Sequence, residues 1–416
     1  MNARELLIHL FDTAVARAMP AGTFDGRRLP DPPAGRTLVL GAGKAAGSMA
    51  RAFEQAWKAP LSGMVVTRYG HGAPCERIEV VEAAHPVPDD AGRAATARML
   101  AAAETLGPDD LVVCLVSGGG SALLAAPAGP LTLEDEQAVT RALLRSGAPI
   151  GAINVVRKHI SAVKGGRLAL AAAPARVVTY IISDIPGDDP AQVASGPTFA
   201  DASSRDDALA ILDRYRIDAP AVREWLENPE SETPKSLPAA QHFVIATARG
   251  ALEAAADEAR NHGYHPVILG DAIEGEARDV ARNHAAIAKA IRAGDGIAAA
   301  PCVLLSGGET SVTVRGGGRG GRNAEYLLAL ALDLGGAAGI SGLAADTDGL
   351  DGSEDNAGAI IGPDTLTAAA KCGVDATSAL AANDAYGFFA GIDALLVTGP
   401  TLTNVNDFRA ILIDPI

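Results

Sequence analysis

Apolar runs that each end in a glycine-rich or acidic turn recur along the chain, and they restrict its fold more than any other feature. They are Thr37–Leu40 before Gly41-Ala-Gly43-Lys44, Leu111–Val116 before Ser117-Gly-Gly-Gly120, and Val177–Ile182 before Ser183-Asp184. Continuous runs of β-branched and aliphatic residues are typical of strands buried on both faces of a parallel sheet. Segments with helical spacing lie between the runs. The sequence therefore predicts an α/β fold.

The length of the chain and one proline-rich segment predict two domains. At 416 residues the chain is longer than a single hydrophobic core usually supports. Between Asn228 and Pro238, three prolines fall within eleven residues, a density that opposes both a helix and a central strand. A second α/β series follows, with apolar runs near residues 242–246, 265–269 and 303–305. We therefore expect domains of residues 1–235 and 236–416.

Charge and composition exclude two classes of function. The formal net charge is -15 and no long cluster of Lys and Arg is present, which excludes nucleic-acid binding. No apolar stretch reaches the roughly 18 residues of a membrane-spanning helix. The cysteines form no CxxC pair and the chain does not open with a signal-peptide pattern, so we expect reduced thiols in a cytoplasmic protein.

The turn Ser117-Gly118-Gly119-Gly120-Ser121 is the first candidate binding site. Three adjacent glycines between a buried strand and a helix start allow backbone N–H groups to crowd around an anion. The functional interpretation is phosphate binding by Ser117, Gly118, Gly119, Gly120 and Ser121. The alternative is a tight turn without a ligand, although three glycines carry an entropy cost that a turn alone does not require.

Two cations stand next to glycine turns and are candidates for contact with an acidic substrate. Lys44 lies at the start of a helix, where a cation is unfavourable unless an anion accompanies it. Arg322 ends a glycine loop that also contains Arg315 and Arg319, and a guanidinium offers a planar fork to an oxyanion. The alternatives are a surface lysine and a glycine hairpin whose arginines pair with surface acids. Arg322 is the stronger catalytic candidate.

Acidic turns offer oxygen ligands for magnesium. Asp184 and Asp189 follow a strand at the end where open α/β sheets bind ligands, and we expect them to hold the metal. A turn rich in Asp, Pro and Gly also forms without a metal. The turn Asp346-Thr-Asp348-Gly-Leu-Asp351 is a second candidate. His85 is interpreted as a hydrogen-bonded structural residue rather than a catalytic one.

Taken in order, these motifs resemble the type II glycerate kinases nearly from end to end. The segments that carry the resemblance are Gly41–Ala46, Ser117–Leu124, Asn154–His159, Ser183–Asp189, Gly320–Glu325, Ala345–Gly352, Asn383–Tyr386 and Thr398–Asp407. The last three are similar to the MOFRL domain of that family. The resemblance implies a Rossmann-like N-terminal domain with a parallel sheet, a smaller α/β C-terminal domain, and an active site in the cleft between them.

The resemblance also implies an activity and its cofactors. Members of the family transfer the γ-phosphoryl group of ATP to the 2-hydroxyl of D-glycerate with Mg²⁺, giving 2-phosphoglycerate and ADP. Their conserved lysine and arginine fall on Lys44 and Arg322. The general base stays open between Asp189 and Lys44, and the assembly stays open between a monomer and a homodimer. Because relatives are often named hydroxypyruvate reductase, an NAD(P)H-dependent reductase is the alternative function.

Overall fold

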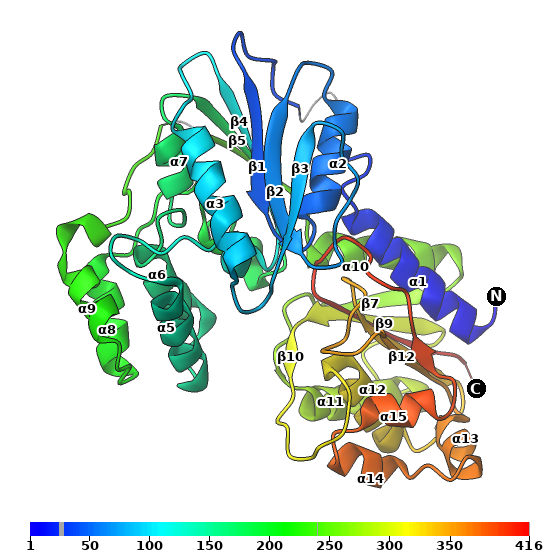
Figure 1. The fold of residues 1–416 in the computed structure, drawn as a ribbon. Coiled ribbons are helices and arrows are strands. Elements are labelled where there is room, and N and C mark those ends of the chain that lie inside the picture. The colour runs from blue at the N-terminus through cyan, green and yellow to red at the C-terminus, as the bar shows by residue number, and fades with distance from the viewer. Residues whose placement is uncertain (25–28, 239, 416) are drawn as a thin grey trace. The chain divides into compact units, whose positions relative to one another are not determined.

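The chain forms two compact units, each built around its own six-stranded sheet (Figure 1). The computed structural model describes residues 1–24, 29–238 and 240–415. The N-terminal unit contains Pro20–Ser183 and Asp188–Ile245, and the C-terminal unit contains Met1–Met19, Asp184–Gly187 and Ala246–Ile416. A single division at residue 235 places the first 19 residues with the N-terminal unit, whereas their contacts assign them to the C-terminal one. The expected two-domain α/β class is confirmed.

The sheet of the N-terminal unit has the strand order β3-β2-β1-β4-β5-β6. The strands are β1 Thr37–Ala42, β2 Ser62–Arg68, β3 Ile78–Ala83, β4 Leu111–Val116, β5 Arg176–Ile182 and β6 Ala240–Ala246. Each pair from β3 to β5 is parallel. This is the strand order of the Rossmann fold, so the expected Rossmann-like sheet is confirmed.

The apolar runs form these strands because other elements cover both faces of the sheet. Every residue of β4 is buried, and it pairs with β1 in a register that sets Leu40 opposite Cys114. Helices that pack against the sheet are α2 Ala46–Ala56, α3 Asp90–Ala103 and α7 Arg167–Ala172. The four-residue helix α4, Gly120–Leu123, directly follows the glycine turn after β4.

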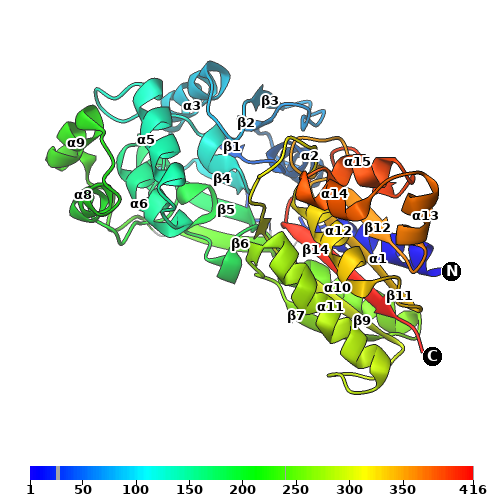
Figure 2. The same ribbon diagram turned by 90° about the horizontal axis from the view of Figure 1, so that it is seen from below.

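A separate helical group completes the N-terminal unit (Figures 1 and 2). Its helices are α5 Leu133–Arg145, α6 Ile150–His159, α8 Arg205–Arg214 and α9 Pro220–Glu227. They share a hydrophobic core that includes Val139, Leu212 and Trp225. The indole N–H of Trp225 is satisfied because it donates to the carbonyl of His159 at 2.9 Å. Short 3-10 turns occur at Pro186–Asp188, Val193–Ser195 and Pro229–Ser231.

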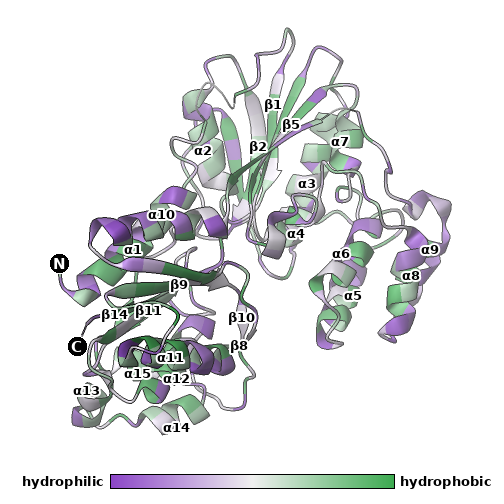
Figure 3. Cartoon of the chain, turned by 180° about the vertical axis from the view of Figure 1, so that it is seen from behind, coloured by the Kyte–Doolittle hydropathy of each residue, from purple (hydrophilic) through white to green (hydrophobic). Residues whose placement is uncertain are grey.

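The sheet of the C-terminal unit is mixed and has the order β13-β12-β11-β14-β9-β7. Its strands are β7 His265–Gly270, β9 Cys302–Gly308, β11 Ile340–Asp346, β12 Gly358–Ile361, β13 Leu395–Leu396 and β14 Asp407–Ile413. Within this six-stranded sheet, the β7–β9 pair is parallel and the other described pairs are antiparallel. Two short strands, β8 Gly275–Glu276 and β10 Thr310–Ser311, pair separately. Strand β9 is hydrophobic along most of its length (Figure 3).

Helices bury their apolar faces against this second sheet and against each other. They are α1 Ala3–Ala18, α10 Ala248–Asn261, α11 Ala277–Ala293, α12 Arg322–Leu334, α13 Thr365–Lys371, α14 Ala376–Ala381 and α15 Ala385–Ala390. Helix α12 packs against α11, and α1 packs against α10. Phe11 of α1 also meets Phe408 of β14 edge to face. Among the helices of the described ranges, none combines the length and apolarity needed to cross a lipid bilayer.

Candidate active site

In the N-terminal unit, two of the expected binding loops meet where the strand order reverses. Strands β1 and β4 are neighbours in the sheet. From β1 the chain goes on to β2 and β3 on one side of this pair, and from β4 it goes on to β5 and β6 on the other side. The carboxyl ends of β1 and β4 are therefore a topological switch point. Lys44 follows β1, and its backbone N–H donates to the carbonyl of Gly118 at 2.8 Å. The N–H of Ala45 donates to Oγ of Ser117 at 3.0 Å. The structure thus brings Lys44 and the glycine turn together.

Two glycines are required at this meeting point. Gly43 has φ +142°, and a Cβ built there would lie 2.1 Å from Oγ of Ser117. Gly119 has φ +79°, and its Cβ would lie 3.0 Å from Nε2 of His85. A side chain at either position would separate the loops or strain the backbone. The glycine pattern is therefore needed for a close approach of two loops as well as for any bound anion.

The residues of the predicted phosphate turn differ in accessibility. Ser117 is fully buried, whereas Gly119 and Ser121 are partly exposed. Oγ of Ser121 lies 2.8 Å from Oγ of Ser195. Because α4 has only four residues, its dipole is small, and an anion here would depend on the N–H groups of the turn itself.

Further ionisable side chains lie near Lys44, and sequence reasoning missed most of them. Burial, with the charges of Lys44 and Arg68, lowers the pKa of His85 to about 3. Burial with the same two cations also lowers the pKa of His71 to about 4. Arg157 adds to the positive potential at His85, and burial lowers its own pKa. Three cations, Lys44, Arg68 and Arg157, thus act on His85 in a protein whose net charge is -15.

The strand order explains why these groups were missed. Arg68 is the last residue of β2, which lies next to β1 in the sheet; His71 follows β2, and His85 follows β3. Sequence reasoning treated His85 as a structural residue, because a lone histidine before proline carries no sign of its neighbours. Only the order β3-β2-β1-β4 shows that the turns after these strands share one edge.

The two aspartates expected to bind magnesium belong to different units. Asp184 is partly buried in the C-terminal unit, where Nδ2 of Asn404 donates to its Oδ2 at 2.9 Å. Nδ2 of Asn406 donates to the carbonyl of Asp184. Asp189 is exposed in the N-terminal unit, and its Oδ1 accepts the N–H of Ala191 at 3.0 Å. Both carboxylates are hard oxygen donors that an ion can reach.

Arg322 lies at the start of α12 in the C-terminal unit and is held by carboxylates. Its Nη2 lies 2.7 Å from Oδ2 of Asp346, and its Nε lies 2.9 Å from Oδ1 of Asp407. Its Nη1 lies 3.1 Å from the more exposed Glu309. Burial opposes the charge, but Asp407, Asp346 and Glu309 together raise the pKa of Arg322 above its usual range. The guanidinium therefore stays charged and is fixed in orientation.

Asp351 fixes the backbone from which Arg322 projects. It is almost fully buried, and it accepts the N–H groups of Asn323 at 3.0 Å and Ala324 at 2.8 Å. Burial raises the pKa of Asp351 to about 7. Gly321 precedes the helix, and a Cβ there would lie 2.2 Å from Oδ1 of Asp351. The second acidic turn, which the sequence suggested as a metal site, thus supplies Asp346 to Arg322 and Asp351 to the helix start.

A polar pocket of about 260 Å³ lies beside Arg322. Thr310, Val312 and Glu325 contribute to its wall. Glu325 is paired with Arg278 at 2.5 Å. Arg319, in the same glycine loop, has another environment, because it is exposed, forms an ion pair with Glu354 at 2.6 Å and lies over the ring of Tyr386. Of these two arginines, Arg322 is partly buried and fixed, whereas Arg319 lies at the surface.

Comparisons with known proteins place the whole chain in one family. Residues 6–227 match the model described as a domain of unknown function (DUF4147), and residues 302–407 match the MOFRL family. D-glycerate 2-kinase of Thermotoga maritima is 40% identical over 95% of this chain and 93% of its own length. The crystal structure of glycerate kinase from that organism has a TM-score of 0.89 at 38% identity, over 99% of each chain. The chain belongs to the glycerate 2-kinase family.

The resemblance drawn from the motifs is therefore confirmed. In this member of the glycerate 2-kinase family, the region that matches DUF4147 contains Lys44 and the glycine turn, and the region that matches MOFRL contains Arg322. A protein of Agrobacterium vitis named putative hydroxypyruvate reductase is 52% identical over 99% of this chain and 95% of its own length. Relatives thus carry both of the names that the sequence analysis considered.

Proposed function

We propose that this glycerate 2-kinase homologue transfers the γ-phosphoryl group of ATP to the 2-hydroxyl of D-glycerate, giving 2-phosphoglycerate and ADP. The observation that carries the proposal is the cationic edge of the Rossmann-like sheet, where Lys44 lies against the glycine turn with Arg68 and Arg157 nearby. A negatively charged substrate requires such a concentration of positive charge in an acidic protein. The free cysteines, two of them buried, agree with a cytoplasmic location.

Phosphoryl transfer depends mainly on positioning and charge stabilisation, which these residues can supply. In the proposed mechanism, the N–H groups of Gly118 and Gly119 and the hydroxyl of Ser121 bind the phosphates of ATP, and the N–H of Gly120 closes the turn by donating to the carbonyl of Ser117 at 3.2 Å. The buried Ser117 ties this turn to the Lys44 loop. Lys44 and Arg322 neutralise the carboxylate of glycerate and the transferring phosphoryl group. The carboxylate partners of Arg322 hold its guanidinium in one orientation before the substrate arrives.

Asp184 and Asp189 are the proposed magnesium ligands. Their carboxylates fit the oxygen preference of Mg²⁺, which proteins usually hold through one or two carboxylates together with substrate phosphates. Magnesium held there would offset the negative charge of the phosphates. Asn404 orients the carboxylate of Asp184 by donating to Oδ2. Asp189 or Lys44 accepts the proton of the attacking hydroxyl, and pH-rate profiles of Asp189→Asn and Lys44→Met distinguish them, because only loss of the true base removes the fall in rate at low pH.

A product assay tests the proposal. Purified protein is incubated with D-glycerate, ATP and Mg²⁺, and 2-phosphoglycerate is resolved from 3-phosphoglycerate by chromatography or ³¹P NMR. We expect 2-phosphoglycerate to form in equal amount with ADP, and Lys44→Met to form both products at least ~100-fold more slowly. Formation of 3-phosphoglycerate alone would reject the regiochemistry. ADP release that does not depend on glycerate would reject the substrate.

The alternative is reduction of hydroxypyruvate, which the name of the Agrobacterium vitis relative suggests. The Rossmann-like strand order also occurs in proteins that bind dinucleotides. However, the turn after β1 has the spacing Gly41-x-Gly43-x-x-x-Gly47, with Lys44 beside the second glycine, instead of G-x-G-x-x-G. Incubation with hydroxypyruvate and NADH or NADPH decides the matter, because oxidation of the nicotinamide without ADP formation in the kinase assay would establish the reductase.

A further inference from the structure

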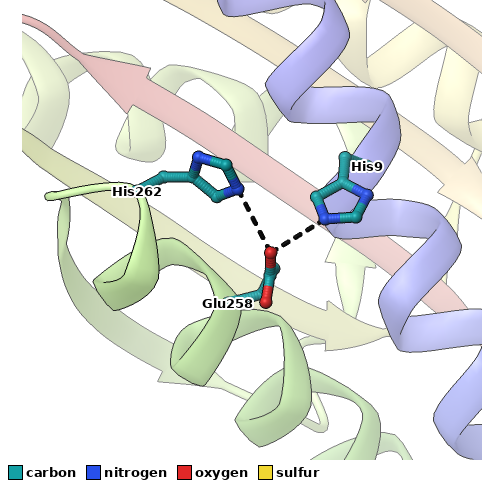
Figure 4. Close-up of side chains that lie close together, drawn as sticks. All are labelled: His9, Glu258 and His262. Atoms are coloured by element: carbon teal, nitrogen blue, oxygen red, sulfur yellow. Dashed lines mark hydrogen bonds and ion pairs between the residues drawn. The ribbon is translucent and has the colours of Figure 1, made fainter. Parts of the chain in front are cut away.

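Two histidines and a glutamate converge on the surface of the C-terminal unit, and none of the three has been assigned a role above. His9 belongs to α1, Glu258 to α10, and His262 caps the end of α10 (Figure 4). Nε2 of His9 lies 2.8 Å from Oε1 of Glu258, and Nε2 of His262 lies 3.1 Å from the same oxygen. The two imidazole rings stand edge to face at 5.7 Å between centroids. One carboxylate oxygen therefore faces two ring nitrogens.

We propose that His9, Glu258 and His262 bind a divalent transition-metal ion of the zinc class. Two imidazoles with one carboxylate form a donor set that Zn²⁺ and Co²⁺ accept, whereas Mg²⁺ and Ca²⁺ prefer oxygen alone. One potential ligand atom from each of the three residues lies within 4.8 Å of the others. A tetrahedral ion with bonds of about 2.1 Å holds its ligand atoms roughly 3.4 Å apart, so the side chains need only small rotations.

The helices place these groups without strain. Glu258 and His262 are four residues apart, so they lie on one face at the end of α10. Nδ2 of Asn261 donates to Oε2 of Glu258 at 3.0 Å, which leaves Oε1 directed at the imidazoles. Such a second hydrogen bond on a ligating carboxylate is typical of metal sites.

The cluster is accessible to an ion from solvent. The side chains of His9, His262 and Glu258 are 42%, 31% and 25% exposed. Water can therefore occupy a fourth position, as in zinc sites with three protein ligands. Because His9 lies about 250 positions before its partners, the ion would link α1 to α10. Metal binding should therefore stabilise the docking of the N-terminal helix.

Cobalt titration of protein without a histidine tag tests this inference. We expect visible d–d absorption bands that saturate at one Co²⁺ per chain in the presence of excess Mg²⁺, and displacement of the bands by Zn²⁺. The double variant His9→Ala/His262→Ala should lose these bands and bind the ion at least ~10-fold more weakly. His265→Ala is the matched control, because His265 is an exposed histidine of the same unit outside the cluster, and it should bind as the unsubstituted protein does.

Thermal unfolding supplies a second readout that does not depend on catalysis. With Zn²⁺ at about 100 times its Kd, the Tm of the unsubstituted protein and of His265→Ala should rise by roughly 3 °C, and that of the double variant should not. Equal affinity for Co²⁺ in the double variant and the unsubstituted protein would overturn the proposal. So would the absence of saturable binding in the unsubstituted protein. Either result leaves the kinase proposal untouched, because the product assay does not involve this cluster.

Discussion

Replacing Arg322 by methionine should separate two roles of this guanidinium. The side chain donates to Asp346 and Asp407, which are 3% and 0% exposed. Removing one partner of a buried ion pair costs about 3–5 kcal/mol of unfolding free energy, because the remaining charge is left in a poor solvent. Arg409 still pairs with Asp407 at 2.5 Å, so we expect a loss near the lower limit, about 3 kcal/mol. If Arg322 also stabilises the transition state, kcat should fall by roughly a thousandfold.

The assays measure the two effects independently. Urea unfolding followed by circular dichroism gives the free energy of unfolding, and the glycerate kinase assay gives kcat and KM under conditions where the variant is folded. In Arg322→Met/Asp346→Asn the buried charge is also removed, so part of the lost stability should return while kcat stays low. Arg319→Met is the matched control from the same loop, because its pair with Glu354 is exposed at the arginine and should contribute less than about 1 kcal/mol.

Three results would refute this reasoning. An unfolding free energy within about 1 kcal/mol of the unsubstituted protein would mean that the buried carboxylates do not depend on Arg322. A kcat within about tenfold, together with the expected stability loss, would restrict Arg322 to a structural role. An increase in KM alone would assign it to ground-state binding of substrate.

Three further predictions concern the glycine turn, the cationic edge and pH. Lys44→Met should lower kcat/KM by at least ~100-fold with little change in Tm, as judged by the product assay and a thermal melt. Gly119→Ala should raise the KM for ATP and cost about 1–3 kcal/mol in urea unfolding, because φ is +79° and His85 lies at contact distance. Burial lowers the pKa of His284 from 6.5 to about 4. Between these two pH values, the unfolded state binds a proton at this histidine and the folded state does not. Stability should therefore be complete above about pH 6.5 and fall by up to about 3 kcal/mol towards pH 4, a dependence that urea titrations should find weaker in His284→Gln.

The sequence predicted the strands and helices better than it predicted which of them pack together. Strands β1, β4 and β5 follow from continuous apolar runs, which only a doubly covered sheet can bury. For helix α1, the sequence did not show which unit it packs in, and the expected domain of residues 1–235 included it. Leu10 and Phe11 pack within the C-terminal unit against elements hundreds of residues away, and nothing local encodes that choice.

The same limit applies to the candidate site. Lys44 and Arg322 were identified because cations beside glycine turns are unusual without an anion. The partners of Arg322 were not predicted as such, because Asp346 and Asp407 become neighbours only through the antiparallel register of β11 and β14. Sequence reasoning considered the turn that begins at Asp346 as a second candidate metal site, and it could not show that Asp346 pairs with an arginine and Asp351 with a helix start.

The surroundings of the key cation differ between the two units, and this difference bears on their roles. Lys44 lies near other cations, whereas Arg322 is paired with carboxylates. Near Lys44, burial and neighbouring cations keep His71 and His85 neutral, which limits the repulsion that the lysine and arginines must tolerate. An arriving anion would relieve that repulsion, so the N-terminal edge gains most from binding a phosphate or a carboxylate. Around Arg322, three carboxylates already balance the guanidinium, and two of them are buried. An anion gains less net attraction there than at an unpaired arginine. What Arg322 offers instead is a fixed geometry, which favours a role in the transition state over one in capturing substrate.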